Sequence, residues 1–188
     1  MSKLILASAS PRRLELLKST NIFPDIVKPA NIDENIKKKE KPNLYLKRIC
    51  YEKALSVQKK YKQDIILSAD TIVTTSQKIF GKPSSKEDAI KTLKYLSGRN
   101  HNVSTGVCIL YKNNKKIKIV NTKIKLKKLH NDEINQYIKT NEWSDKAGSY
   151  AIQGHAERFV IKINGSYSNV VGLPLYETVN LLKSIKNF

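Results

Sequence analysis

Short apolar runs and stretches of helical periodicity alternate along the first half of this chain. An apolar run at residues 4–7 is followed by a segment, residues 11–19, whose leucines recur at helical spacing. The same change of period recurs downstream, where a helical stripe precedes a β-branched apolar run. The complete pattern predicts strands over residues 4–7, 65–75, 102–111, 116–129 and 159–163, helices over residues 11–19, 43–60, 84–96 and 131–140, and a final helix from Pro174.

Polar and small residues at the ends of these segments indicate the helix boundaries. Serine and asparagine side chains cap free N–H groups at helix starts, and glycine adopts the left-handed conformation that ends many helices. We therefore expect N-caps at Ser10 and Asn131, a capping box formed by Ser84 and Glu87, a helix stop at Gly98 and a polar turn over residues 112–115.

The order of the predicted elements favours a mixed α/β sheet with flanking helices. Strands and helices alternate early in the chain, whereas two long strands follow each other in its middle. The sequence contains no internal repeat, no low-complexity segment and no Gly/Ser-rich linker, and its 188 residues are enough to bury a core. We expect a single domain over residues 1–188, within which two lobes are compatible with the pattern.

The formal net charge of +19 attracts polyanions of any kind, nucleic acids and anionic membranes included. The excess consists mostly of lysines scattered along the chain among many isoleucines and asparagines, a bias that an A+T-rich genome also produces. We therefore expect no specific nucleic-acid surface. The charge would instead steer a small acidic substrate inward.

Cysteine usage and hydropathy favour a cytoplasmic protein without a membrane partner. Cys50 and Cys108 lie far apart and form no Cys-x-x-Cys pair. The apolar run at residues 4–7 is too short for a signal-peptide core, and no run approaches the roughly 20 residues of a membrane span. The three histidines are isolated and show no metal-ligand spacing.

The segment Ser8-Ala9-Ser10-Pro11-Arg12-Arg13 is the first candidate for chemistry, because it places two arginines in the first turn of a helix. Cations there oppose the partial positive charge of the helix N-terminus unless an anion binds. With the Ser8 and Ser10 hydroxyls, the arginines would form a phosphate site. The alternative is an ordinary capped helix with two solvated arginines.

Asp70 and Lys53 are charged residues at positions that otherwise predict burial. Asp70 interrupts a strand pattern between Leu67 and Ile72, where an unpaired charge is costly. It either has a structural partner, or binds a divalent metal or acts as a general base. Lys53 lies on the apolar stripe of residues 43–60, so its ammonium either reaches the edge of the core or points into a cleft.

Two further features are compatible with ligand binding. Lys82 lies between Gly81 and Pro83 in a turn just after the Asp70 strand, so it either returns to the same cleft or is solvent-exposed. Residues 145–154 and 165–174 are rich in glycine and small residues, which permits a close approach of backbone to ligand, although tight loops have the same composition. Within them, Gln153 could bind a base edge through both its donor and its acceptor.

Taken together in chain order, these strings resemble the Maf family of nucleotide pyrophosphatases. Each string is short, but the ordered set covers the whole chain and is specific. The matching strings are Ser8-x-Ser10-Pro11-Arg12-Arg13, Glu52-Lys53-Ala54, Ala69-Asp70-Thr71, Gly81-Lys82-Pro83, Leu96-Ser97-Gly98, Asp145-Lys146-Ala147-Gly148, Ile152-Gln153-Gly154 and Gly172-Leu173-Pro174.

The resemblance implies a twisted mixed sheet in two lobes around a central cleft, similar to inosine triphosphatase, and often a homodimer. It implies hydrolysis of a nucleoside triphosphate between its α and β phosphates with Mg²⁺ or Mn²⁺. Asp70 would activate or orient the water and hold the metal with Glu34, although an acid in a polar loop is usually only solvated. Lys53, Lys82, Arg12 and Arg13 would offset the phosphate charge.

Three positions resemble the family members that cut dTTP and UTP. Members that prefer 7-methyl-GTP tend to have Trp, Gln and Glu where this chain has Arg12, Thr71 and Gln153, and a stacking tryptophan with an acidic partner suits a cationic purine. Two departures from the family pattern lie beside the expected base pocket. Asn141 replaces a glycine before Glu142, and His155-Ala156-Glu157 replaces a glycine-rich variant.

A second hypothesis from another class is a non-enzymatic regulator of septum formation that binds nucleotide or DNA through its basic surface. The family's link to division arrest supports it, whereas the presence of every catalytic string favours the enzyme. An enzyme of this kind could also clear modified pyrimidine nucleotides from the pool. Salt-sensitive DNA binding without pyrophosphate release would favour the regulator.

Overall fold

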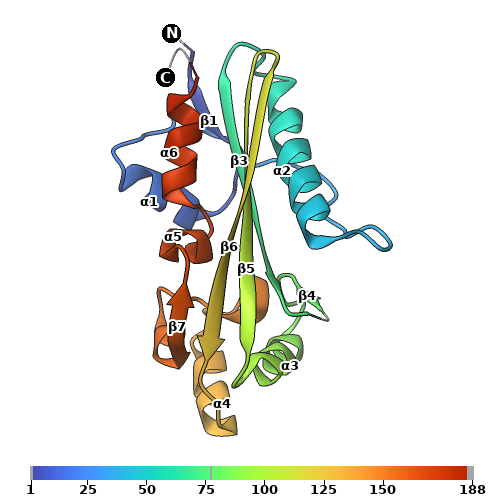
Figure 1. The fold of residues 1–188 in the computed structure, drawn as a ribbon, viewed down its shortest axis with the longest axis vertical. Helices are drawn as coiled ribbons and strands as arrows, with labels where there is room; N and C mark the ends of the chain where they lie inside the picture. Colours follow the sequence, from blue (N-terminus) through green and yellow to red (C-terminus); the bar gives the residue numbers. More distant parts are fainter. Residues whose placement is uncertain (1, 77, 186–188) are drawn as a thin grey trace. The chain divides into compact units, whose positions relative to one another are not determined.

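The computed structural model describes residues 2–76 and 78–185. Figure 1 shows its strands and helices coloured by position in the sequence. The strands are β1 (Leu4–Leu6), β2 (Ile26–Val27), β3 (Ile65–Thr74), β4 (Ile79–Phe80), β5 (Asn100–Tyr111), β6 (Asn114–Leu126) and β7 (Val160–Asn164). The helices are α1 (Pro11–Lys18), α2 (Pro42–Gln58), α3 (Lys86–Leu96), α4 (Asn131–Lys139), α5 (Tyr167–Val171) and α6 (Leu175–Lys183), with short 3-10 turns at Ala147–Ser149 and His155–Phe159.

The strands form a mixed sheet in the order β2-β1-β3-β5-β6-β7, with β4 paired to β3. β1 runs parallel to both β2 and β3, whereas β4 is antiparallel to β3 and β7 is antiparallel to β6. The prediction of a mixed α/β sheet with flanking helices is confirmed. Among the described helices, none has both the length and the apolar character needed to cross a bilayer.

The chain divides into two compact units. The first contains the chain up to Asp70, Thr105–Val120 and the chain from Gly172 onward, and the second contains Thr71–Ser104 and Asn121–Val171. Strands β3, β5 and β6 therefore each contribute residues to both units. The expectation of one domain over residues 1–188 stays a prediction.

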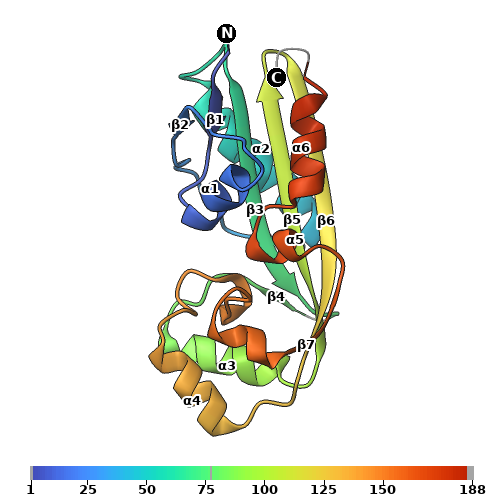
Figure 2. The same cartoon turned by 90° about the vertical axis from the view of Figure 1, so that its left-hand side faces the viewer.

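The first unit has helices on both faces of its strands. Successive side chains of a strand point to opposite faces, so a strand of buried apolar residues needs cover on each face. Leu4 and Leu6 of β1 pack with α1 and α6, whereas Ile5 between them packs with α2. Figures 1 and 2 show α1 and α6 on one side of β1 and α2 on the other. The predicted inner stripe of α2 is confirmed, since all its members are buried: Leu46, Ile49, Cys50, Lys53, Ala54 and Val57.

The second unit has a separate core, in which α3 and α4 pack close together (Figure 2). Leu93 and Leu96 of α3 and Tyr137 of α4 are fully buried in this core. The Tyr137 hydroxyl accepts a hydrogen bond from the backbone N–H of Ala151 at 2.9 Å. This bond fixes the start of the segment that presents Gln153.

Two predicted helix caps are wrong by one residue. α3 has Ser85 rather than Ser84 at its N-cap, and the Ser85 hydroxyl accepts the N–H of Asp88 at 3.2 Å. The Asp88 carboxylate in turn accepts the Ser84 N–H at 3.1 Å, so Asp88 takes the role expected of Glu87.

The start of α4 and the polar turn also differ from prediction. α4 has His130 rather than Asn131 at its N-cap, because the Glu133 carboxylate accepts the His130 N–H at 3.0 Å. The turn between β5 and β6 is shorter than predicted, since β6 begins at Asn114. The positive φ of Gly98, +68°, agrees with the predicted stop of α3.

His101 in the second unit is buried against Tyr150, with 2.7 Å between the imidazole Nε2 and the tyrosine hydroxyl oxygen. Loss of hydration lowers the pKa of His101 to about 4 from an ordinary value of 6.5. The unfolded chain therefore binds a proton at this position between pH 6.5 and 4 that the folded chain does not. Folding stability contributed by neutral His101 is lost as the pH falls through this window.

We predict that the free energy of unfolding falls by roughly 3 kcal/mol between pH 7 and pH 4 through His101 alone. Urea unfolding of the protein and of a His101→Gln variant at several pH values measures this difference. The variant should have the shallower dependence on pH. Parallel pH profiles for the two proteins would show that His101 does not titrate abnormally.

Candidate functional site

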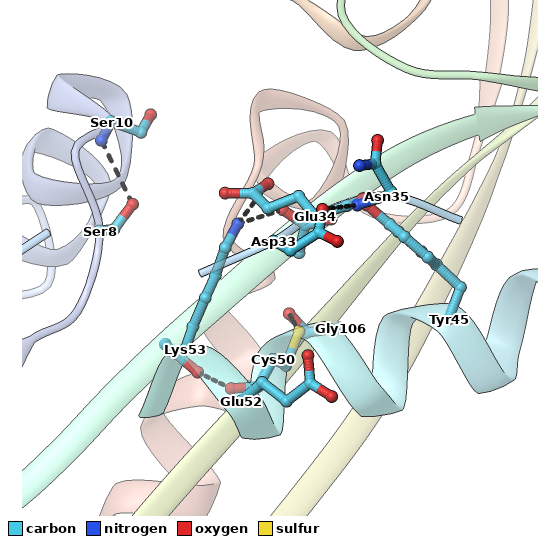
Figure 3. A network of polar contacts seen from close by, with 12 residues as sticks. Ser8, Ser10, Asp33, Glu34, Asn35, Tyr45, Cys50, Glu52, Lys53 and Gly106 are labelled. Atoms are coloured by element: carbon cyan, nitrogen blue, oxygen red, sulfur yellow. Dashed lines mark hydrogen bonds and ion pairs between the residues drawn. The ribbon is translucent and has the colours of Figure 1, made fainter. Parts of the chain in front are cut away.

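The turn between β1 and α1 is held by the Ser8 hydroxyl. Ser8 is buried, and its Oγ accepts the backbone N–H of Ser10 at 3.2 Å and Nη1 of Arg13 at 3.0 Å. Ser10 occupies the predicted N-cap position, but its side chain makes no capping hydrogen bond. Figure 3 shows the bond between Ser8 and Ser10. The Ser10 hydroxyl is therefore not part of the helix cap.

Arg13 is fixed by partners from two distant parts of the first unit. Besides Ser8, its Nε donates to the Gly172 carbonyl at 2.8 Å. Gly172 lies shortly before α6 and has a φ of +127°, a conformation that residues with a side chain avoid. Loss of hydration lowers the pKa of Arg13, and the negative charge of Asp70 acts in the opposite direction. A guanidinium stays protonated in proteins, so Arg13 supplies a fixed positive charge.

Lys53 and Asp70 form a buried ion pair in the first unit. Lys53 is 7% exposed on α2 and Asp70 is 8% exposed on β3, and 2.7 Å separates Lys53 Nζ from Asp70 Oδ1. Lys53 therefore does not reach out to solvent at the edge of the core. The Lys53 ammonium therefore offsets the cost of burying the Asp70 charge in this strand.

Glu34 joins this pair from the segment between β2 and α2. Its Oε2 lies 2.9 Å from Lys53 Nζ, and Figure 3 shows the ammonium directed at this carboxylate. The Glu34 side chain is 43% exposed, whereas Asp70 lies inside. One ammonium thus holds two carboxylates that are 36 residues apart in the sequence, since they occupy positions 34 and 70.

This donor set fits a hard divalent cation that also contacts phosphate. Mg²⁺ is usually bound through one or two carboxylates together with substrate phosphate oxygens, not by a cage made of protein alone. Asp70 and Glu34 supply two carboxylates that lie close together, because both contact the Lys53 ammonium. Among the described residues no group of three or more His, Cys, Asp or Glu side chains could hold a metal, so phosphate oxygens would have to complete the coordination.

Cys50 lies close to this group but is not a candidate nucleophile. Its thiol donates to the Gly106 carbonyl at 3.1 Å, and burial raises its pKa above the ordinary value of 9.0. A thiol that stays protonated is a poor nucleophile and a poor metal ligand. The chemistry of this site therefore depends on oxygen and nitrogen groups.

Three of the other predicted site residues belong to the second unit. Thr71 is half-buried on β3, Lys82 is exposed between β4 and α3, and Gln153 is exposed in the turn after Ile152. Arg12 lies half-buried in the first turn of α1, in the first unit. The roles assigned to all the site residues stay predictions, although the first unit brings Ser8 to Arg13, and Lys53 to Asp70 and Glu34.

The two departures from the family pattern have a physical explanation. Asn141 has a φ of +58°, and asparagine tolerates this conformation better than other residues with a side chain. The Glu142 carboxylate accepts the His155 N–H at 2.9 Å and lies 2.7 Å from its imidazole Nδ1. A Cβ at Gly154 would contact the Glu142 carboxylate, which would have to move to make room for it. The turn that presents Gln153 is thus tied to Glu142.

Comparison with known proteins identifies the family. The model of the family described as Maf-like protein matches residues 3–185, and this chain belongs to that family. A dTTP/UTP pyrophosphatase of Rhizobium johnstonii is 48% identical, over 96% of this chain and 91% of the relative. A dTTP/UTP pyrophosphatase of Mesorhizobium japonicum is 44% identical, over 97% of this chain and 91% of the relative.

A solved structure is also similar to part of the chain. The Staphylococcus aureus Ham1 protein matches with a TM-score of 0.47 and 13% sequence identity, over 65% of this chain and 71% of that chain.

We predict that Lys53→Met lowers the free energy of unfolding by roughly 3 kcal/mol, because it leaves Asp70 buried without a partner and facing Glu34. The double variant Lys53→Met/Asp70→Asn should lose less than the sum of the two single effects. Urea unfolding of the four proteins of this cycle measures the coupling.

A matched control is Lys127→Met, which breaks the more exposed pair of Lys127 with Glu133. This change should cost less than about 1 kcal/mol. If the Lys53 variant lost no more stability than the Lys127 variant, the buried ion pair would not contribute as described.

Proposed function

We propose that this chain is a nucleoside triphosphate pyrophosphatase that hydrolyses dTTP and UTP to the monophosphate and pyrophosphate. The observation that supports the reaction best is the convergence of Asp70 and Glu34 on Lys53 in the first unit, at 2.7 and 2.9 Å. The substrate is supported by relatives of 43–48% identity over at least 96% of this chain, which have the name dTTP/UTP pyrophosphatase. Pyrimidine nucleotides with a modified base are within the same proposal.

We further propose a divalent cation, Mg²⁺ or Mn²⁺, as the cofactor, with Asp70 and Glu34 as its protein ligands. Their oxygen donors have the chemistry that these ions prefer. When bound, the ion would offset negative charge on the phosphate oxygens. Lys53 would hold the two carboxylates close to each other.

In this proposal Asp70 orients the attacking water and accepts its proton. The water oxygen forms a bond to the α-phosphorus, the bond from that phosphorus to the bridging oxygen breaks, and pyrophosphate leaves. Ser8, Ser10, Arg12 and Arg13 would bind the phosphates at the start of α1, where the partial positive charge of the helix adds to the arginines. Lys82 would add a further positive charge, so catalysis is mainly electrostatic.

Base selection is assigned to Arg12, Thr71 and Gln153. The resemblance to the family implies these three residues for members that act on pyrimidine nucleotides, and a neutral amide can pair with a neutral pyrimidine edge. The tie between Glu142 and the turn after Gln153 supports this role, because it limits the positions that the Gln153 backbone can take.

The setting of the reaction is part of the same proposal. We place it in the cytoplasm, where nucleoside triphosphates are made and consumed, with the nucleotide as the partner and no specific nucleic acid. A homodimer is the assembly that membership of the family favours. A role in division arrest would accompany the enzymatic activity.

We predict release of pyrophosphate from dTTP and UTP in the presence of Mg²⁺ or Mn²⁺, with much slower release from CTP, GTP and 7-methyl-GTP. Asp70→Asn should lower kcat by roughly 10²- to 10⁴-fold, because the amide cannot accept the proton of the water. A coupled pyrophosphate assay measures both results.

Asp64→Asn is the matched control, since Asp64 is another acid of the first unit. Its carboxylate accepts the Lys3 N–H at 3.0 Å. This variant should keep the activity of the unmodified chain. Near-normal turnover by a folded Asp70→Asn variant would refute the role of Asp70. Salt-sensitive DNA binding with no release of pyrophosphate from any nucleotide would favour the regulator instead.

A further inference from the structure

Glu34 is an exposed acid on a segment without helix or strand, yet its carboxylate has a defined position. The segment between β2 and α2 comprises residues 28–41, and most of its residues are exposed. Acids in such segments are ordinarily solvated and mobile. Glu34 instead lies 2.9 Å from the Lys53 ammonium. The position of its carboxylate therefore requires contacts that hold its backbone.

Two side chains of α2 supply these contacts. The Tyr45 hydroxyl donates to the Glu34 carbonyl at 3.0 Å, and Nη2 of Arg48 donates to the Asn35 carbonyl at 3.0 Å. Two successive carbonyls are thus fixed by residues one helical turn apart. The Asp33 carboxylate accepts the Asn35 N–H at 2.9 Å and tightens the same turn. Figure 3 shows Tyr45 reaching from α2 to this segment.

Arg48 is itself held in one orientation by two carboxylates. Its Nε and Nη2 donate to the two carboxylate oxygens of Glu40, each at 2.7 Å, and its Nη1 donates to Glu52 at 3.2 Å. The hydrogen bond from Arg48 lowers the pKa of Glu40 to about 2, so Glu40 is charged at neutral pH. Because Glu40 also accepts the Lys37 N–H at 3.1 Å, Arg48 fixes the far end of the segment as well.

Tyr45 is suited to be a permanent donor. It is 6% exposed, and its hydroxyl is engaged by the Glu34 carbonyl at 3.0 Å. The Arg48 guanidinium lies 5.6 Å from the centre of its ring, within cation–π range. The helix that supplies the Lys53 ammonium therefore also supplies both donors that fix the Glu34 backbone.

We propose that Tyr45 and Arg48 are positioning residues that hold Glu34 in place as a metal ligand, acting through the carbonyls of Glu34 and Asn35. The inference rests on the proposed function, because it gives the Glu34 carboxylate a metal to bind. Neither residue touches substrate or metal. Glu52, within the string Glu52-Lys53-Ala54, acquires a role by orienting Arg48.

The test compares Tyr45→Phe and Arg48→Lys with the unmodified chain. Phenylalanine loses only the hydroxyl, and lysine keeps the charge but loses the planar fork. We expect each change to weaken Mn²⁺ binding about tenfold, as changes to groups that orient metal ligands do. Electron paramagnetic resonance of free Mn²⁺, titrated with protein and the α,β-methylene analogue of dTTP, measures the affinity without turnover. With dTTP itself, the concentration of Mn²⁺ at half-maximal rate should rise by the same factor.

Gln58→Ala is the matched control, because Gln58 is also on α2 and donates to a backbone carbonyl, that of Lys112, at 3.2 Å. This variant should bind Mn²⁺ like the unmodified chain. Both test changes should also be repeated in a Glu34→Gln background, where they should have no further effect. Thermal unfolding of every variant reports any general loss of structure.

Unchanged Mn²⁺ affinity in folded Tyr45→Phe and Arg48→Lys proteins would overturn the inference, and so would effects of equal size in the Glu34→Gln background. If either of these results were found while the unmodified chain cleaved dTTP, only the positioning role would fail. If it neither bound Mn²⁺ with the analogue nor released pyrophosphate, the proposed function would fail, and the inference with it.

Discussion

The Lys53 ammonium is the charge on which the candidate site depends. Asp70 lies in a strand whose neighbouring side chains are buried, so without a partner its charge would be strongly destabilising. Lys53 meets this requirement from the inner stripe of α2 and at the same time attracts Glu34. A strand, a helix and an irregular segment are thereby joined at one nitrogen atom. The two carboxylates converge because they share this cation.

The parts of the fold that follow from local periodicity could be predicted from the sequence. The apolar run of β1 and the 3.6-residue apolar stripe of α2 each predict which side chains are buried. The buried positions in the structure agree with both predictions. The stripe includes Lys53, but it does not fix the direction of that side chain because a lysine stem can bend toward solvent. The predicted helix caps are wrong by one residue where a nearby acid, Asp88 or Glu133, accepts the N–H at or just before the N-cap residue.

The contacts between distant segments could not be predicted in this way. Arg13 and the Gly172 carbonyl are 159 residues apart, and only the path of the chain brings them together. The contacts of Tyr45 and Arg48 with the segment before α2 depend on a loop that has no periodic pattern. β2 and β4 have two residues each, which is too few to produce a period in the sequence. The string Glu52-Lys53-Ala54 was the one signal near Arg48, and it indicated Lys53 alone.

The fate of the oxygen of the attacking water distinguishes attack on the α-phosphorus from attack on the β-phosphorus. Hydrolysis of dTTP in water enriched in oxygen-18, followed by mass spectrometry of both products, identifies the phosphorus atom that is attacked. Attack at the α-phosphorus, with Asp70 accepting the proton, predicts the label in dTMP and none in pyrophosphate. Label in pyrophosphate would place the attack on the β-phosphorus and contradict the proposed reaction.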